Sequence, residues 1–261
     1  MASQPGFLLG RDLNKCSRFL VSFPNLADFE VDCRERTVSI FEHHSGASEQ
    51  TIQHLLLDQL LPRLLACAGD LVVHAAGFAT VTGSVLLTGL SGKGKSTLAA
   101  SFHAAGHLLL GDDAMIVHAA LGAVSCRSVY RSLRLHRDSI EAVLPGKREL
   151  APVAEHTDKQ NVIDLGPSPE VANEQPVRAV YCLGEHSDTI RVNRMSPGEA
   201  CMALVEHSFW LDPADLEQTK SRLITASEVA KGVPVFNVAY PRDYGSLPRL
   251  RQIILGGHDI H

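Results

Sequence analysis

The stretch GLSGKGKSTLAA, residues 89–100, constrains the fold more than any other part of the chain. Gly89, Gly94, Lys95 and Ser96 fit the phosphate-binding pattern G-x-x-x-x-G-K-[ST]. The glycines permit backbone angles that a side chain would forbid, and the loop N–H groups then converge on phosphates at a helix N-terminus. This pattern predicts a strand–loop–helix unit that binds a nucleotide.

The flanking segments supply the context that such a loop needs. SVLLT (84–88) is a short apolar strand of the kind buried inside a sheet, and a helix is expected from about Lys95 to Ala105. Lys95 is expected to reach the β- and γ-phosphates, and the Ser96 hydroxyl to bind Mg²⁺. We therefore predict that a nucleotide and Mg²⁺ bind here. The predicted nucleotide-binding residues are Gly89, Leu90, Ser91, Gly92, Lys93, Gly94, Lys95, Ser96 and Thr97.

Two adjacent carboxylates end the next strand, in LLLGDD at Asp112 and Asp113. Ends of such strands line the ligand crevice of open α/β sheets. One carboxylate can serve Mg²⁺, and the other can accept a proton from an incoming hydroxyl. The residues alone do not say which aspartate takes which role, and Asp113 could instead begin a turn.

His74 follows an apolar run one hairpin before the loop. A histidine there can hydrogen-bond to a carboxylate and tune it. A lone histidine beside a strand is more often structural, so the spacing alone leaves both interpretations open.

The rest of the chain reads as a mixture of strands and helices. RFLVSF and TVSIFE predict strands within about residues 7–44, and 49–69 has the apolar spacing of an amphipathic helix that Pro62 should kink. A helix capped by Ser196 is expected in SPGEACMALVEHSF, and one capped by Asp212 in DPADLEQTKSRLITASEVA. The early strands either cover the core, which we favour, or recognise a peptide by strand addition.

Composition excludes several classes of protein. The net charge of −5 offers no basic field for nucleic acid, and none of the six cysteines forms a C-x-x-C pair. The N-terminus has no apolar run of signal length, and no apolar stretch is long enough to span a bilayer. We expect a cytoplasmic protein that binds neither nucleic acid nor membrane.

Taken together, HAAG at His74, the loop GLSGKGKST and GHLLLGDD resemble the catalytic core of the HPr kinase/phosphorylase superfamily. From about residue 50 onward the chain is similar to the short HPr-kinase-like proteins, including the serine kinases encoded beside lasso-peptide pathways. SLRLHRDSIEAV, DKQNVIDL and VPVFNVAYPRDYGSLPRL resemble further segments of these proteins. The loop alone is unspecific, whereas its combination with the histidine and the acid pair is specific.

The resemblance implies an α/β fold: a P-loop kinase core with a mixed sheet flanked by helices at 49–261, and a small β-rich subdomain at 1–48. It implies an ATP- and Mg²⁺-dependent phosphotransferase acting on a serine hydroxyl of a peptide or small protein. Self-association is common among such relatives. Carried over by position, the catalytic residues are Asp112 as base, His74 as its partner and Lys95; the metal ligands are Ser96 and Asp113; and Arg134, Asp158 and Lys159 lie near the phosphates or the acceptor.

Two other functions compete with this hypothesis. One is a kinase for a small-molecule hydroxyl on the same core, and the other is a nucleotide-binding switch without transfer chemistry. LRLHRD stands roughly where the larger bifunctional enzymes carry an EIRGLG-like motif, which argues against a reverse reaction. The second acid argues against a pure switch, because binding alone would not require it.

Overall fold

The computed structural model describes residues 7–11, 18–43, 47–148, 150–154, 157–162, 165 and 173–256. An N-terminal layer holds four strands, and the next segment holds three consecutive helical pieces. The strands are β1 (Leu8–Arg11), β2 (Arg18–Phe23), β3 (Ala27–Asp32) and β4 (Thr37–His43). The helical pieces are α1 (Glu49–His54), the π-helical turn η1 (Leu55–Leu60) and α2 (Leu61–Cys67).

The remaining elements build the larger part of the molecule. Its strands are β5 (Leu71–Val73), β6 (Ala75–Thr80), β7 (Gly83–Thr88), β8 (Leu109–Gly111), β9 (Met115–Ala120), β10 (Ala123–Ser128), β11 (Arg134–Leu135), β12 (Leu150–Ala154), β13 (Thr157–Val162), β14 (Gln175–His186), β15 (Arg191–Arg194) and β16 (Val235–Tyr240). Its helices are α3 (Lys95–Ala104), α4 (Arg137–Val143), α5 (Pro197–Glu206), α6 (Leu216–Gly232), the 3-10 turn η3 (Tyr244–Ser246) and α7 (Leu247–Leu255).

The central sheet has nine strands and mixed directions. Its main path runs β5-β9-β10-β14-β7-β6-β8, and β16 and β15 extend it from β14. β7, β14 and β16 are parallel, whereas β6 is antiparallel to both β7 and β8. Because β7 lies between β14 and β6, the phosphate-binding loop leaves from the middle of the sheet. The predicted mixed sheet is confirmed.

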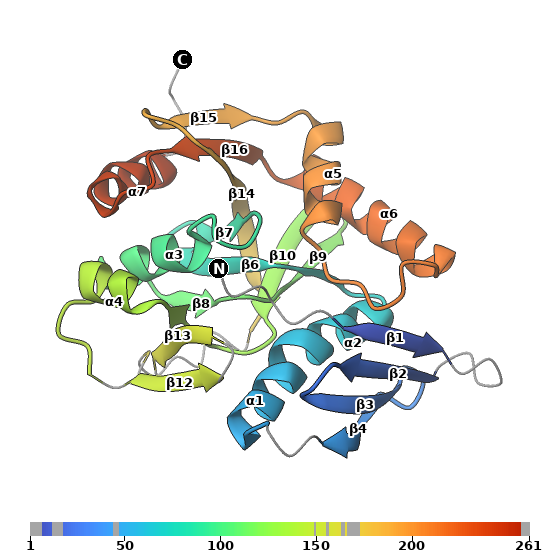
Figure 1. The fold of residues 1–261 in the computed structure, drawn as a ribbon. Helices are drawn as coiled ribbons and strands as arrows, with labels where there is room; N and C mark the ends of the chain where they lie inside the picture. The colour runs from blue at the N-terminus through green and yellow to red at the C-terminus, as the bar shows by residue number, and fades with distance from the viewer. Residues whose placement is uncertain are drawn as a thin grey trace.

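Alternation along β7 explains why helices cover both faces of this sheet. Val85 and Leu87 are buried in one hydrophobic cluster, and Leu86 is buried in another. The first cluster contains residues of α3, α4 and α7, and the second contains residues of α5 and α6. Figure 1 shows these two groups of helices on opposite sides of the sheet.

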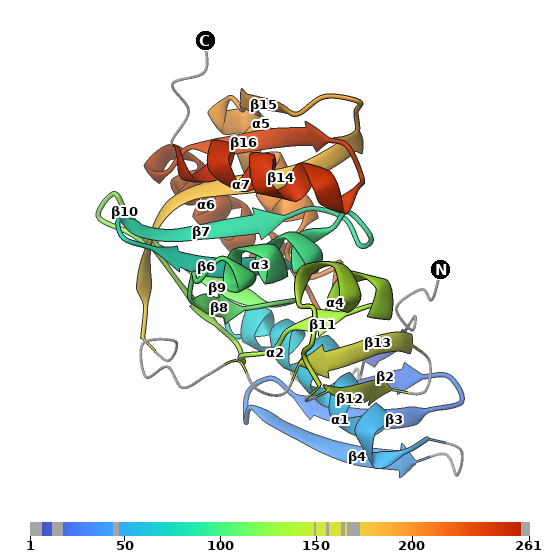
Figure 2. The ribbon, with the colours of Figure 1, turned by 90° about the vertical axis from the view of Figure 1, so that its left-hand side faces the viewer.

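The N-terminal sheet, in the order β1-β2-β3-β4, has its own core. Phe19, Val21 and Phe23 alternate inward along β2 and pack with Leu55 and Leu60 of the helical segment. Figure 2 shows this sheet at the end of the molecule opposite α7, against α1 and α2. The strands predicted at 18–23 and 37–42 are confirmed, and this layer covers the helical segment.

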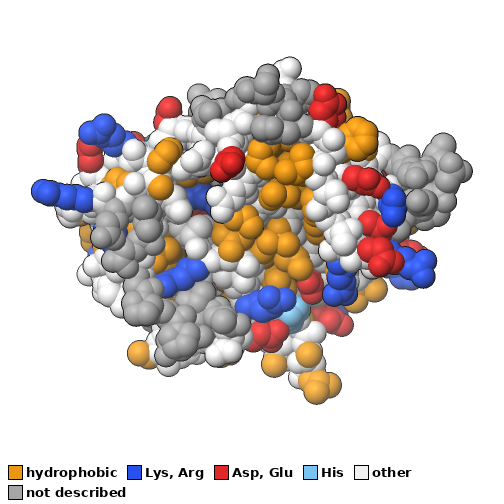
Figure 3. All heavy atoms as spheres, turned by 90° about the horizontal axis from the view of Figure 1, so that it is seen from below, with side chains coloured by type: hydrophobic (Ala, Val, Ile, Leu, Met, Phe, Trp, Pro, Cys, Tyr) orange, Lys and Arg blue, Asp and Glu red, His pale blue; other side chains and the backbone are white. Residues whose placement is uncertain are grey.

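The edge strand of this layer also carries exposed hydrophobic side chains. Ile40 and Phe41 on the edge strand β4 are 51% and 66% exposed. Figure 3 views the molecule from below, the side on which β4 lies in Figure 1, and shows hydrophobic side chains gathered in the middle of that face. No helix in the described part of the chain has the length and apolar character needed to cross a membrane.

One predicted helix start is wrong. Asp212 was expected to cap the helix before Pro213, but α6 begins at Leu216 and its N-cap is Asp215, whose side chain accepts a hydrogen bond from the Gln218 N–H. Asp212 instead accepts from the Ala214 N–H in the preceding turn. Asp-x-x-Asp offers two capping carboxylates three residues apart, and the pattern did not distinguish them. The capping box at Ser196 and Glu199 is confirmed.

Candidate active site

The loop between β7 and α3 has the backbone conformation that its glycines predict. Gly89, Gly92 and Gly94 have φ angles of 137°, 77° and 88°. A Cβ atom at Gly89 would lie 2.6 Å from the Leu183 carbonyl oxygen, and one at Gly94 would overlap the Tyr240 hydroxyl. Backbone angle and close packing therefore both exclude a side chain at Gly89 and Gly94.

Two residues that follow from no sequence motif support the loop from outside. The Tyr240 hydroxyl at the end of β16 donates to the Lys93 carbonyl at 3.0 Å. Arg242 also donates to the Lys93 carbonyl, and it donates to the Gly184 carbonyl at 2.7 Å. These bonds hold the Lys93 carbonyl, while the first N–H groups of α3 have no partner within the helix and are available to an anion.

A cavity of about 700 Å³ opens beside the loop. It brings together residues of the loop, the acid pair, the helical segment and the small sheet β11-β13-β12. Its lining includes Ser91, Gly92, Gly94, Lys95, Ser96, Thr97, His54, Asp58, Gln59, His74, Asp113, Arg134, His136, Asp138, Ser139, Lys159 and Phe209. Of the predicted nucleotide-binding residues, Gly89, Leu90 and Lys93 are outside this lining.

Lys95 is buried against its own loop. Its ammonium group donates to the Gly89 carbonyl at 2.8 Å and to the Leu90 carbonyl at 3.2 Å. Burial lowers the pKa of Lys95 to about 8, and Asp112 and Asp113 partly oppose this shift. An entering phosphate would replace carbonyl partners with anionic oxygens and favour the charged form.

Asp112 precedes Asp113, is fully buried and is outside the cavity lining. Within the described part of the chain, neither of its carboxylate oxygens has a hydrogen-bond partner. Burial and the charge of Asp113 raise the pKa of Asp112 to about 6, and Lys159, the Ser96 hydroxyl and Lys95 oppose the shift. A buried carboxylate without a partner, beside a hydroxyl, is suited to a hard divalent cation.

Magnesium therefore fits this pair of residues. No group of three or more His, Cys, Asp or Glu side chains in the described ranges could hold a metal ion by itself. Mg²⁺ does not need such a cage, since it usually takes one or two protein oxygens together with water and substrate phosphates. Ser96 and Asp112 would supply those protein oxygens.

Asp113 faces the cavity and has a different environment. His74 Nε2 lies 3.6 Å from Asp113 Oδ1, and Arg134 Nη1 lies 3.3 Å from Asp113 Oδ2. Burial alone would raise the pKa of Asp113, but His74, Arg134 and Lys159 outweigh burial and hold this pKa well below its usual range. Burial lowers the pKa of His74, against the opposing effect of Asp113.

The structure thus corrects one predicted pairing. His74 was expected to partner Asp112, and it lies beside Asp113 instead. The reason is the sheet register: β6 and β8 are antiparallel with Gly77 opposite Gly111, which brings the start of β6 next to the residues that follow β8. The strand ends meet as predicted, but the second acid, not the first, meets the histidine.

The three predicted substrate residues are not all at the cavity. Arg134 and Lys159 line it, whereas Asp158 is exposed and outside the lining. Successive residues of β13 point to opposite sides, so Lys159 and Asp158 cannot both face inward.

Sequence reasoning missed a buried acid in the cavity lining. Asp58, in the π-helical turn η1, contacts His54, Tyr130 and Arg134. The sequence does contain an indication of this buried acid: Asp58 interrupts the apolar run LLLDQLL, three residues after the inward-facing Leu55. An acid on the apolar face of a helix indicates a buried partner.

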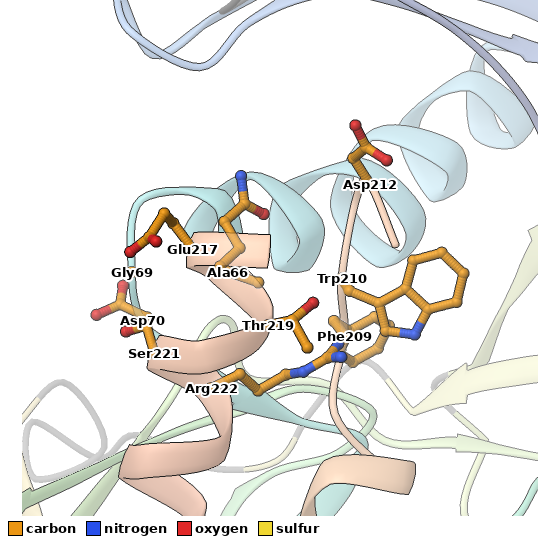
Figure 4. Close-up of a pocket in the computed structure, with 11 residues that line it drawn as sticks. Ala66, Gly69, Asp70, Phe209, Trp210, Asp212, Glu217, Thr219, Ser221 and Arg222 are labelled. Carbon is orange, nitrogen blue, oxygen red and sulfur yellow. The ribbon is translucent and has the colours of Figure 1, made fainter. Parts of the chain in front are cut away.

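A second, smaller pocket of about 170 Å³ lies between α2, α6 and the segment Phe209–Asp212. Figure 4 shows Arg222 of α6 extended toward Phe209 and Trp210 in this pocket. None of the predicted site residues lines it. Phe209 lines both this pocket and the loop cavity, so the two are neighbours.

Comparison with known proteins gives little further guidance. No family model matches the chain, and no curated protein matches it. Among solved structures, one titled "Structure of the Hpr(Ser) kinase/phosphatase from Coxiella burnetii" is 16% identical, with 71% of this chain and 99% of that chain covered, at a TM-score of 0.32. That TM-score is low, and a functional proposal therefore has to come from the residues of this chain.

Proposed function

We propose that this protein is an ATP- and Mg²⁺-dependent phosphotransferase. One observation supports this most strongly: the phosphate-binding loop and Asp113 line the same cavity, and the unpartnered carboxylate of Asp112 is buried next to Ser96. A protein that only bound nucleotide would need the loop and a metal ligand. A second carboxylate facing the cavity supplies what transfer needs in addition.

The loop residues bind the phosphates. Backbone N–H groups at the start of α3 and the Lys95 ammonium neutralise charge on the transferring group, which is the main catalytic contribution in this chemistry. Ser96 and Asp112 would hold Mg²⁺, which when bound supplies further charge neutralisation at the phosphate oxygens. We assign the metal role to Asp112 in place of Asp113, because the Asp112 carboxylate lies next to the Ser96 hydroxyl. Asp113 is instead contacted by His74 and Arg134.

Asp113 takes the role of base. It orients the acceptor hydroxyl and receives its proton as the acceptor oxygen bonds to the γ-phosphorus. The bond from that phosphorus to the oxygen bridging the β- and γ-phosphates breaks, and ADP leaves with that electron pair. The low pKa of Asp113 is compatible with this role, because the transition state is loose and needs orientation more than strong basicity.

The proposed acceptor is a serine hydroxyl of a peptide or small protein, the acceptor that the sequence resemblance implies. The experiment compares Asp113→Asn with Asp112→Asn, using mass spectrometry to follow phosphopeptide formation from candidate seryl peptides and calorimetry to follow ATP binding. We expect D113N to lower transfer by about 10²- to 10⁴-fold while ATP affinity stays within about 3-fold. We expect D112N to remove the Mg²⁺ dependence of ATP binding.

Asp158→Asn is the matched control, since Asp158 is a nearby aspartate that is exposed and outside the cavity. Its transfer rate should equal that of the wild type. If D113N kept full activity while D112N abolished transfer with normal Mg²⁺-dependent binding, Asp112 would be the base. If the wild type bound ATP but transferred phosphate to no seryl peptide, small molecule or water, the proposal of a phosphotransferase would fail.

A further inference from the structure

Three side chains converge on Asp58 at the edge of the loop cavity. His54 Nδ1, the Tyr130 hydroxyl and Arg134 Nη1 all contact its carboxylate. The Asp58 side chain is 4% exposed and the Arg134 side chain 9% exposed, so this is a buried ion pair with additional partners. A buried pair of this kind is weak evidence for stability, because desolvation offsets its attraction. Its position at the cavity calls for another explanation.

Arg134 is shared between two carboxylates. The same nitrogen, Nη1, contacts Oδ2 of Asp58 and lies 3.3 Å from Oδ2 of Asp113. The guanidinium carbon also lies 5.4 Å from the centre of the Tyr130 ring. Asp58 and Tyr130 therefore both contact the guanidinium that lies beside the proposed base.

The helical segment places Asp58 there by an unusual turn. Leu55–Leu60 is π-helical, between the α-helical segments α1 and α2. Such turns are rare and recur at functional sites. The turn buries Asp58 together with Gln59, and both residues line the cavity that the phosphate-binding loop also lines.

The chemistry of guanidinium explains what this arrangement achieves. An arginine with one carboxylate partner tends to form two parallel hydrogen bonds that occupy both carboxylate oxygens. With Asp113 as sole partner, Arg134 would occupy the oxygens that an acceptor hydroxyl needs. With Asp58 holding part of the guanidinium, Arg134 contacts Oδ2 of Asp113. An acceptor hydroxyl can then still approach Oδ1, which lies 3.6 Å from His74 Nε2. The remaining N–H groups of Arg134 can face an anion in the cavity.

We propose that Asp58 is a positioning residue for phosphoryl transfer: it holds Arg134 in the cavity so that Asp113 can engage the acceptor and Arg134 can face the transferring group. This inference rests on the proposed phosphotransferase function. It adds a residue of the N-terminal helical segment to a site otherwise built from the central sheet and the small sheet β11-β13-β12.

A double-mutant cycle tests it, with Asp58→Asn, Arg134→Gln and the double variant, measured by kcat for transfer and by ATP affinity. We expect D58N to lower kcat by about 10- to 100-fold, as a small misplacement of a catalytic group does, with ATP affinity within about 2-fold. The double variant should be no slower than R134Q, because Asp58 acts through Arg134. Asp32→Asn is the control: Asp32 is a buried aspartate of the N-terminal sheet, paired with Arg18 at 2.9 Å and outside the cavity, and its loss should leave kcat unchanged.

Additive losses in the cycle, or a D58N variant with wild-type kcat, would overturn the inference. Should D58N not fold, Tyr130→Phe removes one contact to Asp58 while keeping both charges and the ring. That variant should lower kcat by about 3- to 10-fold, again without further loss beyond R134Q; a wild-type rate would count against Asp58.

A structural readout separates this inference from the proposed function. In a crystal structure of nucleotide-free D58N, the Arg134 guanidinium should turn onto Asp113 with two hydrogen bonds. Were the wild type to show no transfer activity, this movement would still support the positioning role, while the phosphotransferase proposal failed. An Arg134 that stays in place in D58N would refute the positioning role whatever the activity.

Discussion

Two neighbouring aspartates have opposite environments, and the backbone between them explains why. Asp113 has a φ of 72°, in the left-handed region that non-glycine residues seldom adopt. The chain turns at this residue, and Asp112 is fully buried whereas Asp113 lines the cavity. Strained backbone of this kind gathers at functional sites, where the surrounding structure holds it in place.

The buried charge of Asp112 should destabilise the nucleotide-free protein at neutral pH. Burial raises the pKa of Asp112 from 3.8 to about 6. Below pH 3.8 the carboxyl group is protonated in the folded and the unfolded chain and does not affect stability. As the pH rises through about 6 the folded chain loses this proton, and the folded state becomes less stable. Asp112→Asn removes this cost. We expect the Tm of the metal-free variant to exceed that of the wild type by about 3–6 °C at pH 7.5 and by less at pH 5.

Scanning calorimetry at the two pH values measures this difference. Asp158→Asn again serves as the exposed control, with an unchanged Tm. A D112N protein less stable than the wild type at pH 7.5 would show that a partner stabilises the Asp112 carboxylate.

The sequence predicted which side chains come together better than it predicted which of them are paired. The loop pattern identified Lys95 and Ser96, and strand ends identified His74 and the acid pair. Which of the two acids faces the cavity goes with a backbone angle at Asp113 that residue types do not reveal. Asp58 was missed because its partners, Tyr130 and Arg134, follow it by more than 70 residues.

At the scale of elements, the phosphate-binding loop depends on a neighbouring strand as much as on its own glycines. β16 is two strands away from β7, with β14 between them, yet its end reaches the loop through Tyr240. The Tyr240 hydroxyl occupies the space that a side chain at position 94 would need. Glycine at this position thus serves packing in addition to backbone freedom.

Gly94→Ala should weaken Mg²⁺·ATP binding by about 10-fold or more, because the methyl group displaces Tyr240 and strains a backbone with φ of 88°. Adding Tyr240→Phe should restore part of the affinity. Without the hydroxyl, the nearest atoms to the added Cβ are Arg242 Nη1 at 3.6 Å and the Tyr240 ring carbon at 3.8 Å, which are ordinary contacts.

Titration calorimetry compares the two variants. Gly106→Ala is the matched control, since its φ is 91° and nothing lies within 4 Å of an added Cβ; it should lose stability but not affinity. If Y240F gave G94A no benefit, backbone strain alone would explain the defect.

Most elements could be predicted from local patterns, and the exceptions have local causes. The buried strand at 84–88, the helix after the loop and the capped helix at Ser196 follow from apolar spacing and capping residues. The π-helical turn at Leu55–Leu60 could not be predicted in this way. A π-helical turn has one extra residue, and this insertion cannot be recognised in a sequence run that is apolar throughout. The segment DKQNVIDL, residues 158–165, is only partly described, and its residues up to Val162 belong to β13.

At the scale of the whole molecule, the N-terminal layer shares a core with the helical segment that leads into the cavity. Phe29 and Val31 of β3 are fully buried in the same cluster as Leu55, Leu60 and Leu211. Leu55 and Leu60 are the ends of the π-helical turn that carries Asp58. A division of the chain at residue 48 stays a prediction, and this shared core argues that the two sides unfold together.

Phe29→Ala should therefore destabilise the entire chain by about 3–5 kcal/mol, as expected for a large side chain lost from a core. The fluorescence of Trp210, the only tryptophan, and the loss of Mg²⁺·ATP binding should follow one denaturation curve. Leu8, which is 65% exposed in the same sheet, offers Leu8→Ala as a control with little effect. A transition of the N-terminal layer that left nucleotide binding intact would instead establish 1–48 as an independent domain.

The tip of the β6–β7 hairpin is a suitable position for a chemical label. Its tip, at Val81, projects fully into solvent, and β7 runs six residues from Gly83 before the loop begins, a span of about 20 Å. A fluorophore or affinity label attached through Val81→Cys would lie on the strand that leads into the predicted nucleotide-binding loop, at the end away from that loop. Because the tip lies about 20 Å from the loop, a label there could report nucleotide binding without obstructing it.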